Sequence, residues 1–219
     1  MCALCAFFVV AAPAHAQVET SAPFGRPSGG TWTATGGETV GRDQGVAHVE
    51  AGWPGVGFTF LRGMDERTDL GFHVGFNYGF EGTANSVVGL NLAVPIRHRL
   101  AGGGDTSIAL RADPGLSVYG NKGAALVGVG GPVGIVAGFR MDPHLSVDVG
   151  ADLPVLLSFA NPAGLLIGPQ FGGGAEYLLD RNLAVTFRAR VGPEFALASG
   201  GSGAQAGFTT LLGLAYNLH

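Results

Sequence analysis

The sequence predicts an all-β protein that forms a single antiparallel up-and-down transmembrane β-barrel of ten strands, with eight strands as the alternative. Three observations lead to this fold class. Apolar and polar residues alternate with period two over most of the chain from residue 46, and clusters of Gly, Asn, Asp and Pro interrupt the alternation. Charged residues make up only 13% of the chain, whereas average soluble proteins contain roughly 25%. Few charges therefore remain to cover an outer surface in water.

The clearest alternation lies between Asp69 and Phe80. Leu, Phe, Val and Tyr occupy the even positions of this stretch, and Asp, Gly, His and Asn occupy the odd positions. The segments 86–100 and 205–218 repeat the pattern, so each has one mainly apolar face. Helical spacing fits none of the three, which indicates strands.

Reading the rest of the chain in the same way gives ten candidate strands, and an even number is what single-chain bacterial barrels require. The first two candidates are short, and only Trp53, Pro54 and Gly55 separate them, so they are alternatively one long kinked strand. The candidates are residues 46–52, 56–62, 69–80, 86–100, 106–119, 132–141, 145–159, 164–179, 183–197 and 205–218.

The connections between these strands fall into two alternating sets. One set is short and mostly carries Asp or Arg: 64–68, 101–104, 142–144 and 180–182. The other is richer in Gly, Asn and Ser and includes the longest loop: 81–85, 120–131, 160–163 and 198–204. Outer-membrane barrels have short periplasmic turns and longer external loops. The first set is therefore predicted to be periplasmic, together with both chain termini.

The N-terminal residues predict export. An apolar run from Ala6 to Ala12 precedes Pro13-Ala14-His15-Ala16, which resembles a signal peptide cleaved after Ala16. A lipoprotein is a weaker alternative, because Cys5 precedes the apolar run instead of following it. Residues 17–45 are rich in Thr, Ser, Pro and Gly, so we predict a flexible periplasmic leader there. The predicted organisation is signal peptide 1–16, leader 17–45 and transmembrane barrel 46–219.

Alternation alone fits both a membrane barrel, which is apolar outside, and a soluble lipocalin-like carrier, which is apolar inside. The charges on the polar face decide between them, because six acids and six bases can pair in a lumen but would form only a sparse solvent coat. The many glycines on the same face suit a narrow interior. The predicted lumen charge network is Asp69, Arg97, Arg99, Arg111, Asp113, Arg140, Asp148, Asp152, Glu176, Arg188, Arg190 and Glu194.

Several other functions are disfavoured. A net charge of -4 and the lack of a Lys or Arg run argue against a nucleic-acid partner. No stretch reaches the ~18 consecutive apolar residues of a spanning helix. The Gly-rich stretches 102–104 and 172–174 are not followed by Lys-Ser/Thr, and the six histidines lack metal-ligand spacing. We therefore predict no catalytic residue, no cofactor and no metal, and the sequence names no small-molecule ligand.

Over residues 46–219 the chain resembles the small outer-membrane β-barrel proteins of Gram-negative bacteria. The resemblance rests on the signal peptide, the even strand set, the alternation and a last strand that resembles an assembly signal, with its aromatic residue displaced to Tyr216. It implies location in the cell outer membrane, with membrane lipid and the barrel assembly machinery as partners. The implied role is structural or that of a narrow porin-like pore. An outer-membrane enzyme is an alternative, but it needs a His near the 81–85, 120–131 and 198–204 loops, and none contains one.

Overall fold

The computed structural model describes residues 32–80, 83, 85–121, 124–159, 163–198 and 201–218. In these residues no helix is long and apolar enough to cross a membrane. The strands are β1 (Gly45–Trp53), β2 (Gly55–Gly63), β3 (Thr68–Gly79), β4 (Ser86–Ala93), β5 (Ile96–Gly103), β6 (Thr106–Ala112), β7 (Gly115–Asn121), β8 (Ala124–Arg140), β9 (Leu145–Ser158), β10 (Gly164–Ile167), β11 (Gln170–Leu178), β12 (Leu183–Ala198) and β13 (Gly201–Leu218).

The thirteen segments form ten barrel strands, because three of those strands are interrupted by a proline. β4 and β5 both pair with β3, β6 and β7 both pair with β8, and β10 and β11 both pair with β9 and β12. The interruptions fall at Pro95, Pro114 and Pro169, each of which lacks a backbone N–H for the ladder. Pairing continues across two of the breaks, since Pro95 and Pro114 accept hydrogen bonds from the N–H groups of Gly71 and Val94.

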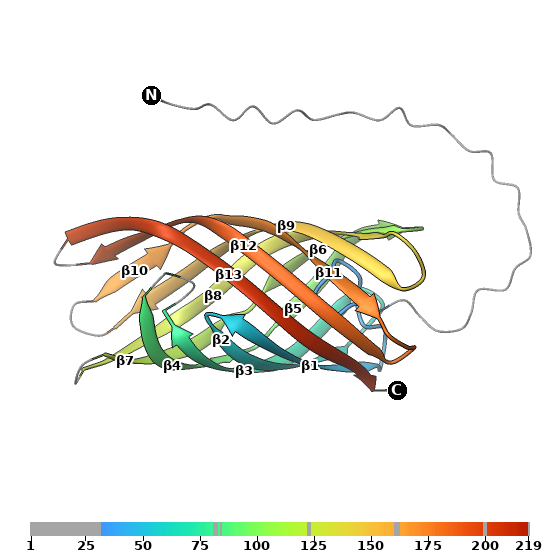
Figure 1. The fold of residues 1–219 in the computed structure, drawn as a ribbon, viewed down its shortest axis with the longest axis horizontal. Coiled ribbons are helices and arrows are strands. Elements are labelled where there is room, and N and C mark those ends of the chain that lie inside the picture. The colour runs from blue at the N-terminus through green and yellow to red at the C-terminus, as the bar shows by residue number, and fades with distance from the viewer. Residues whose placement is uncertain are drawn as a thin grey trace, which may run out of the picture.

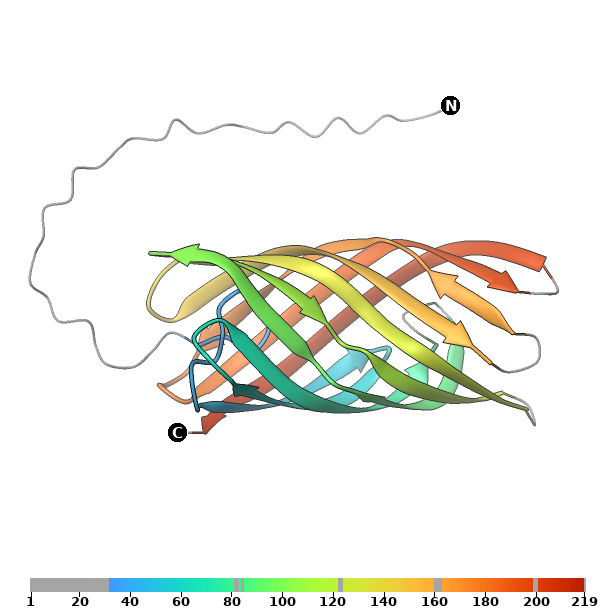
Figure 2. The same ribbon diagram turned by 180° about the vertical axis from the view of Figure 1, so that it is seen from behind.

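The barrel is closed and antiparallel throughout, as predicted. Each strand pairs with the next in sequence, and β1 closes the ring by pairing with β13 from Gly45↔Leu218 to Trp53↔Thr210. The strands run obliquely to the long axis of the molecule (Figures 1 and 2). The prediction of ten strands is confirmed, including β1 and β2 as separate strands, which the turn at Trp53-Pro54 joins.

The predicted faces are also confirmed. In the segment 86–100 the side chains of Val88, Leu90 and Leu92 are more than half exposed on the outside of the barrel. Arg97 and Ala93, which alternate with them, are buried inside. The same division holds along β13, where Leu212 and Leu214 are exposed and Ala215 and Asn217 are buried. An apolar exterior and a polar interior exclude the lipocalin-like alternative, whose polarity is opposite.

Both ends of the barrel chain, at Gly45 and Leu218, lie at one end of the barrel, here called the terminal end (Figure 1). Three of its turns share one device: Asp65, Asp142 and Asp180 each accept a hydrogen bond from the backbone N–H two residues further on. The N–H groups of His144 and Leu145 lower the pKa of the Asp142 carboxyl, because they stabilise its charged form. These Asp residues explain why the predicted short turns are tight.

At the opposite end of the barrel, the prediction of longer loops is wrong in two places. β7 runs to Asn121 and β8 begins at Ala124, so most of the predicted loop 120–131 is a paired hairpin. β12 and β13 likewise pair up to Ala198↔Gly201, within the predicted loop 198–204. The prediction took the glycines of this stretch as evidence for a loop, but in β8 glycine permits close contact between strands. Gly131 has φ +147°, and a Cβ there would overlap the carbonyl oxygen of Asp113.

The rim of the opposite end is uneven. β1 stops at Trp53, opposite Thr210, whereas β13 continues to Gly201 with β12 as its partner. The hairpins β7–β8, β9–β10 and β12–β13 therefore extend farther along the axis than the β1–β2 turn (Figures 1 and 2). At this low point of the wall the Trp53 ring stacks on Phe208 with ring centroids 5.8 Å apart, and Tyr78 packs edge-on against Trp53 at the same distance.

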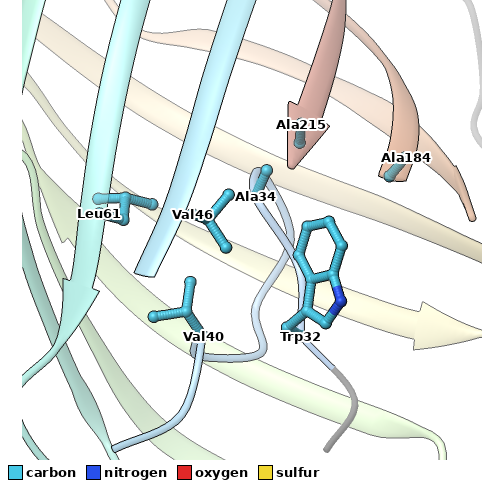
Figure 3. Close-up of a cluster of buried hydrophobic side chains, with 7 residues drawn as sticks. All are labelled: Trp32, Ala34, Val40, Val46, Leu61, Ala184 and Ala215. Atoms are coloured by element: carbon cyan, nitrogen blue, oxygen red, sulfur yellow. The ribbon is translucent and has the colours of Figure 1, made fainter. Parts of the chain in front are cut away.

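The prediction of a flexible leader over 17–45 does not hold for its second half. Residues 32–37, 39 and 40 are buried, and Figure 3 shows Trp32, Ala34 and Val40 packed against side chains of the barrel strands. The physical reason is that polar groups on the barrel wall bind the backbone of this irregular stretch. Residues 1–31, which include the predicted signal peptide, lie outside the described residues. We call residues 32–44 the plug segment.

Candidate functional site: the barrel lumen

An apolar cluster anchors the plug segment at the terminal end. Trp32 is 5% exposed and packs with Val46 of β1, Ala184 of β12 and Ala215 of β13 (Figure 3). Its indole N–H donates to the carbonyl oxygen of Arg181, 3.1 Å away. Ala184 and Ala215 are small residues on the lumen face of β12 and β13, and they leave room for the indole ring of the plug segment.

Two carboxylates on the wall bind backbone N–H groups of the plug segment. Glu176 of β11 accepts hydrogen bonds from the N–H groups of Ala34 at 2.9 Å and Thr35 at 3.3 Å. Asp69 of β3 accepts one from the N–H group of Val40 at 3.2 Å. The plug segment has almost no regular structure, and these side chains satisfy donors that would otherwise be buried without partners.

Arg97 of β5 binds the carbonyl groups of the same segment. Its guanidinium group donates to the backbone oxygens of Thr33 at 2.8 Å and Gly36 at 3.1 Å, and to the carboxylate of Asp69 at 2.8 Å. Arg99, two residues further along the same face, forms an ion pair with Glu38. The fork of donors on arginine suits this task, because one side chain reaches several acceptors at once.

Deeper in the lumen, two arginines and two carboxylates form a second network. Arg111 forms a two-pronged pair with Asp152, and Arg190 donates to Asp152 at 3.1 Å and to Asp148 at 3.2 Å. A separate pair joins Arg188 of β12 to Glu50 of β1 at 3.1 Å. Asp148, Asp152 and Arg190 have side chains at most 5% exposed. Buried charges of this kind require partners.

Glycines on the lumen face make room for these large side chains. Gly134 pairs with Asp152 across β8 and β9, and a Cβ on Gly134 would overlap the Asp152 carboxylate. In the same way Gly89 lies opposite Tyr119, whose ring occupies the space where a Cβ would be. The polar-face glycines therefore serve the narrow interior that the sequence predicted.

Between the plug segment and the opposite end lies a cavity of about 260 Å³, here called the central cavity. Ala34 and Thr35 of the plug segment form part of its lining, so the plug segment bounds it on the terminal side. Two histidines also line it: His48 shares a hydrogen bond with Thr186 at 2.8 Å, and His73 shares one with Thr59 at 2.8 Å.

Aromatic and polar side chains fill part of the lumen on the side of the opposite end. Tyr119 is 1% exposed, packs edge-on against Phe80 and accepts a hydrogen bond from Asn77 at 2.9 Å. Gln170 donates to Glu194 at 2.8 Å. Phe80 was predicted on the apolar outer face, but a register shift between Asn77 and Gly79 accompanies its contact with Tyr119.

The structure places the twelve predicted charged residues as follows. Asp69, Arg97, Arg99 and Glu176 hold the plug segment. Arg111, Asp148, Asp152 and Arg190 form one network, and Arg188 pairs elsewhere. Asp113 lines the central cavity, Glu194 binds Gln170, and Arg140 lines a small space at the terminal end without a described ion pair.

Sequence reasoning missed three lumen residues. His48 and Glu50 lie in β1 at positions that alternate with the exposed Val49, so the same period-two rule identifies them. Glu38 belongs to the plug segment, where no periodicity exists to signal its direction. Among the described residues, no group of three or more His, Cys, Asp or Glu side chains is placed to hold a metal ion.

No known protein family matches the chain, and no curated protein is recognisably similar to it in sequence. Solved structures are similar in fold. A designed transmembrane β-barrel shares 16% identity over 81% of this chain and 97% of its own, with a TM-score of 0.33. The KdgM porin shares 10% identity over 80% of this chain and 99% of its own, with a TM-score of 0.38. KdgM in complex with disordered oligogalacturonate gives 12% identity, 80% and 99% coverage, and a TM-score of 0.37.

The closed ten-stranded ring, the apolar exterior and the charged interior together define the class of this protein. It is a transmembrane β-barrel. Its particular features within that class are the buried plug segment at the terminal end and the ion pairs inside the lumen.

Proposed function

We propose that this protein is a non-enzymatic, narrow-pore protein of the outer membrane, whose plug segment closes the lumen at the periplasmic end. The observation that carries the proposal is the central cavity, a space of about 260 Å³ that charged side chains partly line, inside a barrel with an apolar exterior. A purely structural barrel needs no such space. The terminal end faces the periplasm, because both ends of the barrel chain and the tight Asp turns lie there.

The surroundings of the barrel follow from the same proposal. Its apolar outer face contacts the lipid of the outer membrane, and its last strand, β13, is the segment that the barrel assembly machinery recognises. A catalytic role is less well supported, because His48 and His73 each hydrogen-bond a threonine hydroxyl and neither hydrogen-bonds a carboxylate. The lumen charges instead fill the interior and leave a narrow passage.

The test is conductance in a planar lipid bilayer, with the full-length exported protein. Replacing Trp32 and Val40 together by Ala removes two apolar anchors of the plug segment, and we expect a clear rise in conductance over the unmodified protein. The matched control is Trp53→Ala, which removes the other tryptophan of the chain at the opposite end of the barrel. A folded double variant that does not conduct would show a structural role instead.

A further inference from the structure

We propose that the lumen prefers cations over anions and that Asp113 determines this preference; the proposal rests on the pore function proposed above. The first observation is the charge balance. The sequence predicted six acids and six bases, but the structure adds Glu38 and Glu50 to the acids. Within the described residues the lumen holds eight carboxylates against six guanidinium groups: Glu38, Glu50, Asp69, Asp113, Asp148, Asp152, Glu176 and Glu194, against Arg97, Arg99, Arg111, Arg140, Arg188 and Arg190.

The second observation concerns the arginines that line the central cavity. Arg97 is bound to Asp69 and to plug-segment carbonyls, Arg111 and Arg190 share Asp152, and Arg188 is bound to Glu50. Each of these positive charges is therefore already compensated by a carboxylate. An anion entering the cavity would have to compete with those ion pairs for the same donors.

Asp113 differs from the other carboxylates of the central cavity. It lies at the break between β6 and β7, where its backbone N–H donates to the carbonyl oxygen of Pro132 at 2.9 Å. Its side chain lines the cavity and makes no hydrogen bond or ion pair with any described residue. The guanidinium groups of Arg111 and Arg188, which also line the cavity, are held by Asp152 and Glu50.

Two further carboxylates in the lumen are bound by neutral donors. Glu176 is bound by backbone N–H groups of the plug segment, and Glu194 is bound by the amide of Gln170. A cation that crosses the central cavity passes Asp113, which no described ion pair neutralises, and the substrate class is small monovalent cations, including protonated amines.

The experiment is the reversal potential in a KCl gradient across a planar bilayer. It uses the full-length protein, or the Trp32→Ala, Val40→Ala background if the plug segment closes the unmodified pore. We expect a preference for K⁺ over Cl⁻. Asp113→Asn should lower the K⁺/Cl⁻ permeability ratio about two- to five-fold, the effect of one unit charge acting across several ångströms of water. Asp113→Glu should keep the preference.

The matched control is Asp105→Asn, which removes the same charge from an exposed turn at the terminal end, outside the central cavity. Heat-dependent mobility in electrophoresis establishes that each variant is folded. A conducting pore that favours Cl⁻, or one whose ratio is the same with Asp113→Asn as with Asp105→Asn, overturns this inference and leaves the pore function standing. No conductance in any folded variant overturns the pore function itself.

Discussion

The guanidinium group of Arg97 lies 2.6 Å from the carboxylate of Asp69, and the two side chains are 6% and 0% exposed. Both residues also bind the plug segment, through its carbonyl and its N–H groups respectively. One buried ion pair therefore joins β3, β5 and the N-terminal stretch. Removing a single partner leaves the other charge buried and uncompensated, which is the costly way to break such a pair.

Arg97→Met is accordingly expected to destabilise the folded barrel by about 3 to 5 kcal/mol. The measurement is urea-dependent folding into lipid vesicles. The matched control is Arg99→Met, which breaks the partly exposed pair with Glu38 and should cost clearly less. Equal losses in the two variants would contradict the central role of the Asp69–Arg97 pair.

Leu92→Arg tests the assignment of the outer face. Leu92 is 54% exposed on the outside of β4, among other apolar side chains. An arginine on the lipid face near the bilayer midplane costs about 2 to 4 kcal/mol, so insertion into vesicles should be impaired. Leu92→Met keeps the position apolar and should insert normally. If the arginine variant inserted as readily as the methionine variant, the outer face of β4 would not contact lipid.

The part of the fold and of the lumen that can be predicted from the sequence is the part with a regular period of two. Where alternation is regular, as along 86–100 and 205–218, strands and faces were both predicted, because a period of two fixes which side chains share a face. Glu50 obeys the same period of two, so its lumen position can be predicted from the sequence. The position of the plug segment cannot, because hydrogen bonds from Glu176, Asp69 and Arg97, all distant in sequence, determine it.

The glycine-rich stretch 120–131 shows a second reason why part of the fold cannot be predicted from the sequence. Glycine marks loops when the backbone needs freedom, and it marks strands when a neighbour needs space. Composition does not separate the two cases. The residue on the neighbouring strand distinguishes them: Gly131 contacts the backbone of Asp113, and Gly128 contacts the side chain of Leu156. The sequence therefore predicted the barrel and its lumen charges more completely than the shape of its opposite end.

Gly134→Val tests this use of glycine in the lumen. A side chain at position 134 would overlap the Asp152 carboxylate, which holds Arg111 and Arg190. We expect a loss of stability of about 3 kcal/mol or more, because a displaced carboxylate leaves the buried guanidinium group of Arg111 without its partner and that of Arg190 with Asp148 alone. The control is Gly103→Val, a position where a Cβ would meet no atom within 4 Å. Thermal unfolding in detergent compares them, and similar transition temperatures would mean that Asp152 moves aside freely.

The last prediction fixes the plug segment to the wall. A Cβ on Gly37 would lie 2.9 Å from Oγ of Ser107 on β6, which is close enough for a disulfide once residue 37 shifts away from the Ser107 carbonyl oxygen, 2.8 Å from the same Cβ. The two cysteines of the chain, Cys2 and Cys5, belong to the predicted signal peptide, so Gly37→Cys with Ser107→Cys adds the only pair to the mature protein. We expect low conductance when this bond is oxidised and higher, fluctuating conductance when it is reduced, while Ser107→Cys alone should not respond. Because oxidation changes only the freedom of residues 32–44 and no lumen charge, identical conductance in both states would mean that the plug segment does not control the passage.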